Sequence, residues 1–134
     1  MAGTALIMQS SGTATIEEWA KLDLSAPNSR VLRLTRVQLD ANSHPLAVEE
    51  VVLALERFRG LAANGGDVPD IVELAQRHGL SLGHASERVA IVHASREVAS
   101  HLQIAPGADV LSLNRIVATA DGDPVEWRVT FRKI

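Results

Sequence analysis

Residues 30–53 read RVLRLTRVQLDANSHPLAVEEVVL, and this stretch decides the fold. Apolar and polar residues alternate over residues 31–39, which is the pattern of a strand with one buried face. Residues 40–44 are polar and typical of a turn, and Pro45 opens a second apolar run. The stretch therefore predicts a β-hairpin with its tip at residues 40–44.

The same pattern occurs a second time in the chain. Residues 109–131 read DVLSLNRIVATADGDPVEWRVTF and match the first copy at a constant offset of 79 residues. The matching pairs are Val31 with Val110, Leu32 with Leu111, Leu34 with Leu113, Arg36 with Arg115 and Pro45 with Pro124. Two copies are too few for a solenoid, which needs about three repeats. The repeat predicts one domain built from two similar hairpin units, each introduced by a helix.

Length and composition restrict the class of protein. At 134 residues, the chain is predicted to be a single domain over residues 1–134. The net charge is −3, so the chain by itself lacks the basic surface that binding to DNA phosphates needs. It contains no cysteine, which fits a reducing cytoplasm, and no apolar run approaches the roughly 18 residues of a membrane span. We therefore expect a cytoplasmic protein that does not bind membranes.

The N-terminal part of the chain is predicted to form a strand, a loop and a short helix. The strand covers residues 5–9 and the polar loop residues 10–13. Thr15 and Glu18 have the spacing of a capping box, in which each side chain binds the backbone amide of the other residue. The helix that follows is expected to bury an apolar face containing Ile16, Trp19 and Ala20, with Leu22 as a further candidate.

The middle of the chain is predicted to contain a second helix, a strand and a third helix. The second helix covers residues 67–78, with Asp67 as its N-cap and Gly79 just beyond its end. A strand over residues 82–93 and a helix capped by Ser95 lead into the second hairpin. Hairpins that alternate with short helices predict an α+β fold with a mainly antiparallel sheet.

Several motifs, in this order and spacing, resemble the UTRA domain of GntR-type bacterial transcription regulators of the HutC subfamily. They are Val31–Arg36 (VLRLTR), Pro45–Glu50 (PLAVEE), Arg77–Leu80 (RHGL), Glu87–Val89 (ERV) and Asp121–Trp127 (DGDPVEW). The resemblance implies a chorismate-lyase-like fold, a small-molecule effector site over the sheet, and a homodimer. Such regulators bind DNA through a winged-helix domain, and we expect no such domain within these 134 residues.

Arg36 is the first candidate for a ligand contact. An arginine among apolar strand neighbours binds an anion well, because guanidinium matches the geometry of carboxylate and phosphate groups. The alternative is a structural pair with Glu49 or Glu50 across the hairpin. In the family, an arginine at this place faces the effector, which favours ligand contact. Gln38 stands where many relatives carry a second arginine, so a sugar-phosphate site would have less positive charge here.

Four further residues complete the predicted ligand-binding set. Glu49 follows Pro45 at the spacing of the carboxylate that contacts ligand hydroxyl or amine groups in the family, and Glu126 is predicted to play the same role in the second copy. Asp70 lies near a ligand-binding position of the family, although a first-turn carboxylate of the helix is the alternative. Arg132 is a second candidate cation, or a solvated residue near the chain end. Together with Arg36, these residues predict a small, polar and at least partly anionic effector.

No catalytic residue, metal site or cofactor is predicted from the sequence. The histidines lack metal-ligand spacing, and no phosphate-binding glycine motif is present. Three functions remain open at this point. The first is an effector-sensing and dimerisation domain of a transcription regulator, the second a chorismate-lyase-like enzyme, and the third an interaction domain without a ligand.

Overall fold

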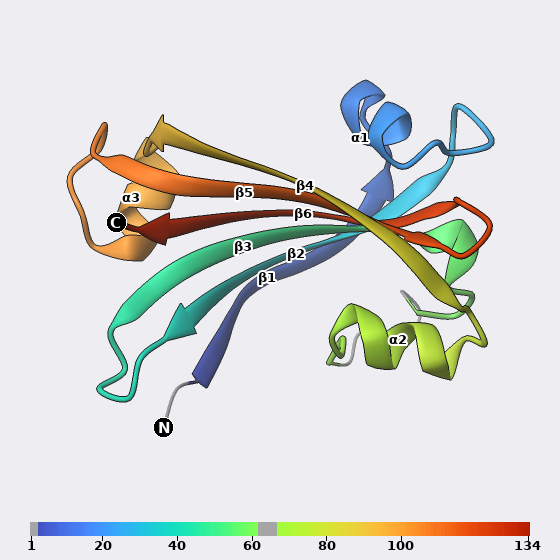
Figure 1. Cartoon of the computed structure of the whole chain (residues 1–134), viewed down its shortest axis with the longest axis horizontal. Coiled ribbons are helices and arrows are strands. Elements are labelled where there is room, and N and C mark those ends of the chain that lie inside the picture. The colour runs from blue at the N-terminus through green and yellow to red at the C-terminus, as the bar shows by residue number, and fades with distance from the viewer. Residues whose placement is uncertain (1–2, 62–66) are drawn as a thin grey trace.

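The computed structural model describes residues 3–61 and 67–134 and shows one twisted sheet with helices on both of its faces (Figure 1). In chain order the elements are β1 (Gly3–Thr13), α1 (Ile16–Lys21), β2 (Arg30–Leu39), β3 (Pro45–Ala54), the 3₁₀ turn η1 (Leu55–Arg57), α2 (Ile71–Arg77), β4 (Leu82–His93), α3 (Arg96–Leu102), β5 (Asp109–Thr119) and β6 (Pro124–Lys133). The predicted α+β fold is confirmed. In the described part of the chain, no helix has both the length and the apolar character that crossing a membrane requires.

The sheet contains the two predicted hairpin units side by side. The strand order is β1-β2-β3-β6-β5-β4, and every neighbouring pair is antiparallel. The two units meet where β3 pairs with β6. At this seam Glu50 lies opposite Val129, its counterpart at the offset of 79 residues. The sequence repeat therefore corresponds to an approximate two-fold axis between β3 and β6.

The first strand is longer than the sequence predicts. Residues 10–13, which are predicted to be a loop, continue β1 and pair with residues 30–33 of β2. Serine and glycine carry little strand propensity of their own. The ladder of hydrogen bonds to β2 holds this segment in the sheet in spite of its composition.

Two faces of the sheet are covered by different helices. Leu34 and Val51 pack with Ile71 and Leu74 of α2 on one face. On the other face, α3 packs against Val37, Val48 and Val110. On the same face, Leu22 and Leu24, which follow α1, pack against Val31 and Ala54. Arg36 and Glu49 lie on the same face as Leu34 and Val51, because side chains two residues apart on a strand share a face. Of the α-helices in the described residues, α2 is the one that covers this face.

The start of α2 differs from the sequence prediction. Asp70, and not Asp67, is the N-cap, and its side chain accepts a hydrogen bond from the Glu73 amide at 3.0 Å. Pro69 therefore precedes the helix instead of lying in its first turn. The predicted end is confirmed, because Gly79 follows the C-cap with a φ of +67°, a conformation that favours glycine.

The capping box at the start of α1 is confirmed, but the predicted apolar face is wrong for its members within the helix. Thr15 and Glu18 exchange both backbone hydrogen bonds. Ile16 and Trp19, however, are exposed. Leu22, the further candidate of the predicted face, lies at the C-cap and is fully buried. A helix of six residues presents too short an apolar stripe for spacing alone to identify its buried side.

Glu18 anchors α1 to the sheet through Arg33 of β2. The Arg33 Nη2 and Nε atoms donate to the two oxygens of the Glu18 carboxylate at 2.6 and 2.7 Å. Burial raises the pKa of Glu18, but the hydrogen bonds from Arg33 and Thr15 together with the charge of Arg33 outweigh it, so the pKa lies below the usual 4.5. The carboxylate form therefore stabilises the folded chain.

We expect Glu18→Gln to lower the free energy of unfolding at pH 7 by about 1.5–3 kcal/mol, the range for a hydrogen bond to a charged group. Because the folded-state pKa is depressed, this contribution is fully present above the unfolded value near 4.5 and is lost as pH falls through the folded-state pKa. Urea unfolding from pH 7 to pH 3 should show the gap between wild type and variant closing. Glu17→Gln, an exposed neighbour, is the matched control. A gap that stays constant over this pH range would contradict the prediction.

Candidate functional site

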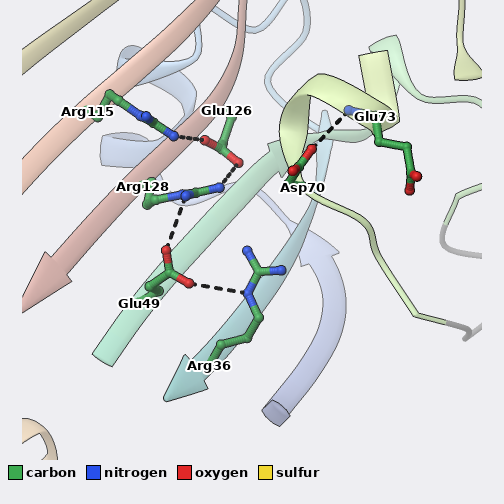
Figure 2. Close-up of polar contacts among 7 residues, drawn as sticks. All are labelled: Arg36, Glu49, Asp70, Glu73, Arg115, Glu126 and Arg128. Carbon is green, nitrogen blue, oxygen red and sulfur yellow. Dashed lines mark hydrogen bonds and ion pairs between the residues drawn. The ribbon is translucent and has the colours of Figure 1, made fainter. Parts of the chain in front are cut away.

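Five charged side chains form a continuous network on the face of the sheet that α2 covers (Figure 2). They are Arg36 on β2, Glu49 on β3, Arg115 on β5, and Glu126 and Arg128 on β6. Sheet register brings them together, since Arg36 lies opposite Glu49 and Arg115 lies opposite Arg128. The pairing of β3 with β6 joins the two halves. We refer to these five side chains as the charged network.

Arg128 is the centre of the charged network. Its Nη1 atom donates to Glu49 Oε2 at 3.1 Å, and its Nη2 atom donates to Glu126 Oε2 at 3.0 Å. The two outer arginines are held less tightly. Arg36 Nε lies 3.7 Å from Glu49 Oε1, and Arg115 Nη2 lies 3.5 Å from Glu126 Oε1. Each carboxylate therefore bridges two arginines.

The charged network is largely withdrawn from solvent and carries one surplus positive charge. The side chains of Glu126 and Glu49 are only 2% and 8% exposed, whereas that of Arg115 is 31% exposed. Three arginines face two carboxylates. Within the described part of the chain, buried atoms without a hydrogen-bond partner are the Nε atoms of the three arginines and Glu126 Oε1. Buried donors and charges need partners, so the network retains the capacity to bind an anion.

A cavity of about 430 Å³ opens beside one end of the charged network. Its volume falls within the range of small-molecule sites. The lining residues come from the start of α2, from β4 to β6, and from the charged network itself: Asp70, Ile71, Val72, Leu82, Gly83, His84, Ala85, Arg115, Val117 and Arg128. The cavity therefore combines two arginines with mostly aliphatic walls.

One glycine in the wall of the cavity is required by the close approach of two chain segments. A Cβ atom built on Gly83 would lie 2.5 Å from Ala120 Cα, a distance that real Cβ contacts do not show. The backbone is irregular here, because the β4–β5 register shifts between Leu82 and His84. Any side chain at position 83 would push β4 away from the end of β5 and change the shape of the cavity.

The structure brings together three of the six predicted site residues and separates the others. Arg36, Glu49 and Glu126 belong to the charged network, but none of them is among the described residues that line the cavity. Asp70 lines the cavity, and its side chain also caps α2. Gln38 is half-buried on β2, two residues beyond Arg36, and Arg132 is exposed on β6.

Arg115 and Arg128 were missed as site residues by sequence reasoning, although a signal for both was present. At the offset of 79 residues, Arg115 corresponds to Arg36 and Arg128 corresponds to Glu49. Glu49 and Arg128 are directly hydrogen bonded to each other. Glu126 is not the positional counterpart of Glu49, because the same offset relates Glu126 to Ala47. The described residues contain no group of three or more His, Asp or Glu side chains that could hold a metal ion.

Comparison with solved structures finds the same fold in regulator domains. The "ligand-binding domain of a putative GntR-family transcriptional regulator from Bordetella bronchiseptica" is similar with a TM-score of 0.84 and 26% identity, over 99% of this chain and 84% of that chain. The effector domain of PhnF from Mycobacterium smegmatis has a TM-score of 0.86 at 20% identity, over 99% of this chain and 81% of that one. A second structure of PhnF from Mycobacterium smegmatis contains a longer chain. The match to it covers 98% of this chain and 58% of the PhnF chain, with a TM-score of 0.85 and 20% identity.

The family assignment rests on a match that runs nearly the whole length of the chain. The model of the UTRA domain matches residues 2–132. The matched region contains both hairpin units, the seam between β3 and β6, and the whole charged network. The chain belongs to the UTRA domain family.

Proposed function

We propose that the chain is the effector-sensing part of a GntR-type, HutC-subfamily transcription regulator in the cytoplasm. Binding of a small molecule here modulates DNA binding by a winged-helix domain outside these 134 residues. The match of the UTRA domain to residues 2–132 is the observation that carries this proposal. The similarity to a structure named as a GntR-family ligand-binding domain supports it.

The effector is a small molecule with at least one negative charge. The charged network contains one more arginine than carboxylate, and two of its arginines line the cavity. We add Arg115 and Arg128 to the ligand-binding residues proposed from the sequence, which are Arg36, Gln38, Glu49, Asp70, Glu126 and Arg132. Arg36 and Glu49 act through Arg128, which Glu49 holds in place.

A thermal-shift screen of the isolated chain against small anions tests the sensing function. A ligand that binds only the folded state stabilises it by about 2.7 kcal/mol at 100 times its Kd, which is readily visible as a rise in Tm. At least one compound should raise Tm in wild type and lose this effect in Arg115→Met. The isolated chain should not bind duplex DNA at physiological salt, given its net charge of −3. The proposed function fails if a broad screen produces no such compound.

We expect the chain to form a homodimer. Both edge strands expose large apolar side chains: Leu6, Ile7 and Met8 on β1, and Val89 and Ile91 on β4. Apolar edge strands left open to solvent tend to associate. Sedimentation at micromolar concentrations should give twice the mass of the 14.4 kDa chain. Ile7→Lys on β1 and Ile91→Lys on β4 each place a charge on one edge strand, and the variant that reduces the measured mass to that of a monomer identifies the edge that forms the dimer interface. A clean monomer at high micromolar concentration would exclude the dimer.

The chorismate-lyase-like enzyme is the competing proposal, because the fold is shared. In the charged network each carboxylate contacts two arginines, which does not favour a role as a general base. Incubation of the chain with chorismate, followed by measurement of 4-hydroxybenzoate, separates the two proposals. We expect no product above the rate without protein. A ligand-free interaction domain, in contrast, would show neither product nor any thermal shift.

A further inference from the structure

We propose that the effector is a monocarboxylate with a mostly hydrocarbon body, bound in the cavity that Arg115 and Arg128 line. This inference rests on the proposed sensing function and specifies the chemical class of its ligand. Two independent features of the cavity carry it: its charge and the composition of its walls.

The charge around the cavity suits a single negative charge. Arg128 is already committed to both carboxylates, at 3.1 and 3.0 Å. Arg115, with one contact at 3.5 Å and a side chain that is 31% exposed, is the arginine that an incoming anion can reach. A carboxylate matches the one surplus arginine of the charged network, whereas a phosphate dianion brings a second negative charge for which the network has no further arginine. Asp70, whose side chain caps α2, lies at the cavity wall and makes a second negative charge there less favourable still.

The walls of the cavity suit a hydrocarbon. Five of the lining residues are aliphatic: Ile71, Val72, Leu82, Ala85 and Val117. Besides the two arginines, the polar lining residues are Asp70 and His84. A sugar would also place hydroxyl groups against the five aliphatic side chains, and each hydroxyl buried there without a partner costs about 1–3 kcal/mol or a factor of roughly 5–150 in affinity. The walls therefore discriminate against sugar phosphates and favour an apolar body.

Three probes, each with a six-membered ring, distinguish the contribution of the ligand's charge from that of its body in binding experiments with the whole chain. Cyclohexanecarboxylate has the proposed chemistry, cyclohexylmethanol has the same body without the charge, and glucose 6-phosphate has a dianion with hydroxyl groups. Calorimetry and ¹H–¹⁵N NMR spectra should show binding of the carboxylate, with changes at the amides of Ile71 and Val117. Neither of the other probes should bind at the same concentrations.

Two variants test the two features, and a third serves as control. Arg115→Met should weaken binding of cyclohexanecarboxylate about 10-fold or more, because it removes the ligand's charged partner. Val72→Asp should weaken it to a similar degree by placing a carboxylate in the aliphatic wall. Val72 is 56% exposed, so this substitution leaves the fold intact. Arg88→Met alters an exposed arginine of β4 that lies opposite Asn114 and outside the cavity lining, and should leave binding unchanged.

Three other results of these experiments would contradict the proposal, each for a different reason. Binding of glucose 6-phosphate that is lost in Arg115→Met, with none of the carboxylate, refutes the ligand class but leaves the sensing function standing. Carboxylate binding that is equally tight in Arg115→Met and Val72→Asp places the ligand outside this cavity. If no carboxylate of varied chain length or ring size binds, the class is wrong. The broad thermal-shift screen then decides separately whether the chain senses a ligand at all.

Discussion

Phe58→Ala is expected to lower the free energy of unfolding by about 3–5 kcal/mol. Phe58 follows η1, is fully buried, and packs edge-on against His78 with ring centroids 5.3 Å apart. It belongs to the same core cluster as Ile71 and Leu74 of α2. Truncation leaves a cavity between α2 and the sheet that the surrounding chain fills only in part. Because Ile71 also lines the ligand cavity, we expect weaker ligand binding in this variant as well.

Urea unfolding at pH 7 measures the effect of Phe58→Ala, and Phe58→Leu is the matched control. Leucine retains most of the apolar volume, so its cost should be clearly smaller. A loss below about 1 kcal/mol for Phe58→Ala would show that α2 is not packed on the sheet through this side chain. Equal losses in both variants would mean that ring shape, and not buried volume, determines the stability.

The fold could be predicted from the sequence because its main signals are local. Alternation over residues 31–39 predicts a strand, and the second copy at an offset of 79 predicts the second hairpin. The structure confirms both as β2–β3 and β5–β6. The end of β1 was not predictable in this way, because Ser10, Ser11 and Gly12 owe their strand conformation to pairing with β2. The start of α2 was placed wrongly at Asp67, because spacing alone does not distinguish it from Asp70, an equally good N-cap residue three positions further on.

The sequence predicts contacts of the candidate site within a single hairpin, but not the contacts between the two hairpins. Residues on facing strands of one hairpin lie opposite each other, which brings Arg36 beside Glu49. The contact of Glu49 with Arg128 requires β3 and β6 to pair, and these strands are far apart in the chain. The repeat contains this information when its offset is applied to the charged residues. The chemistry of the cavity walls needed the structure, since Val72 and Leu82 come from separate elements.

Arg128→Met is expected to lower the free energy of unfolding by about 3 kcal/mol, the lower end of the range for removing one partner of a buried ion pair. Arg128 is the one residue of the charged network that contacts both Glu49 and Glu126. Without it, the Glu126 carboxylate keeps, among the described residues, a single ion-pair contact, that of 3.5 Å to Arg115, although its side chain is 2% exposed. Methionine fills a similar length but supplies no charge. The loss therefore comes from stranded carboxylates and not from lost volume.

Chemical unfolding of two further variants determines the origin of the loss caused by Arg128→Met. Arg132→Met changes an exposed arginine on the same strand, four residues away, and should stay within about 0.5 kcal/mol of wild type. Adding Glu126→Gln to Arg128→Met removes the more deeply buried stranded charge, so part of the lost stability should return. If Arg128→Met costs no more than Arg132→Met, the charged network does not hold β3 and β6 together. If Glu126→Gln deepens the loss instead, Arg115 alone compensates that carboxylate, and the surplus charge assigned to the ligand is already in use.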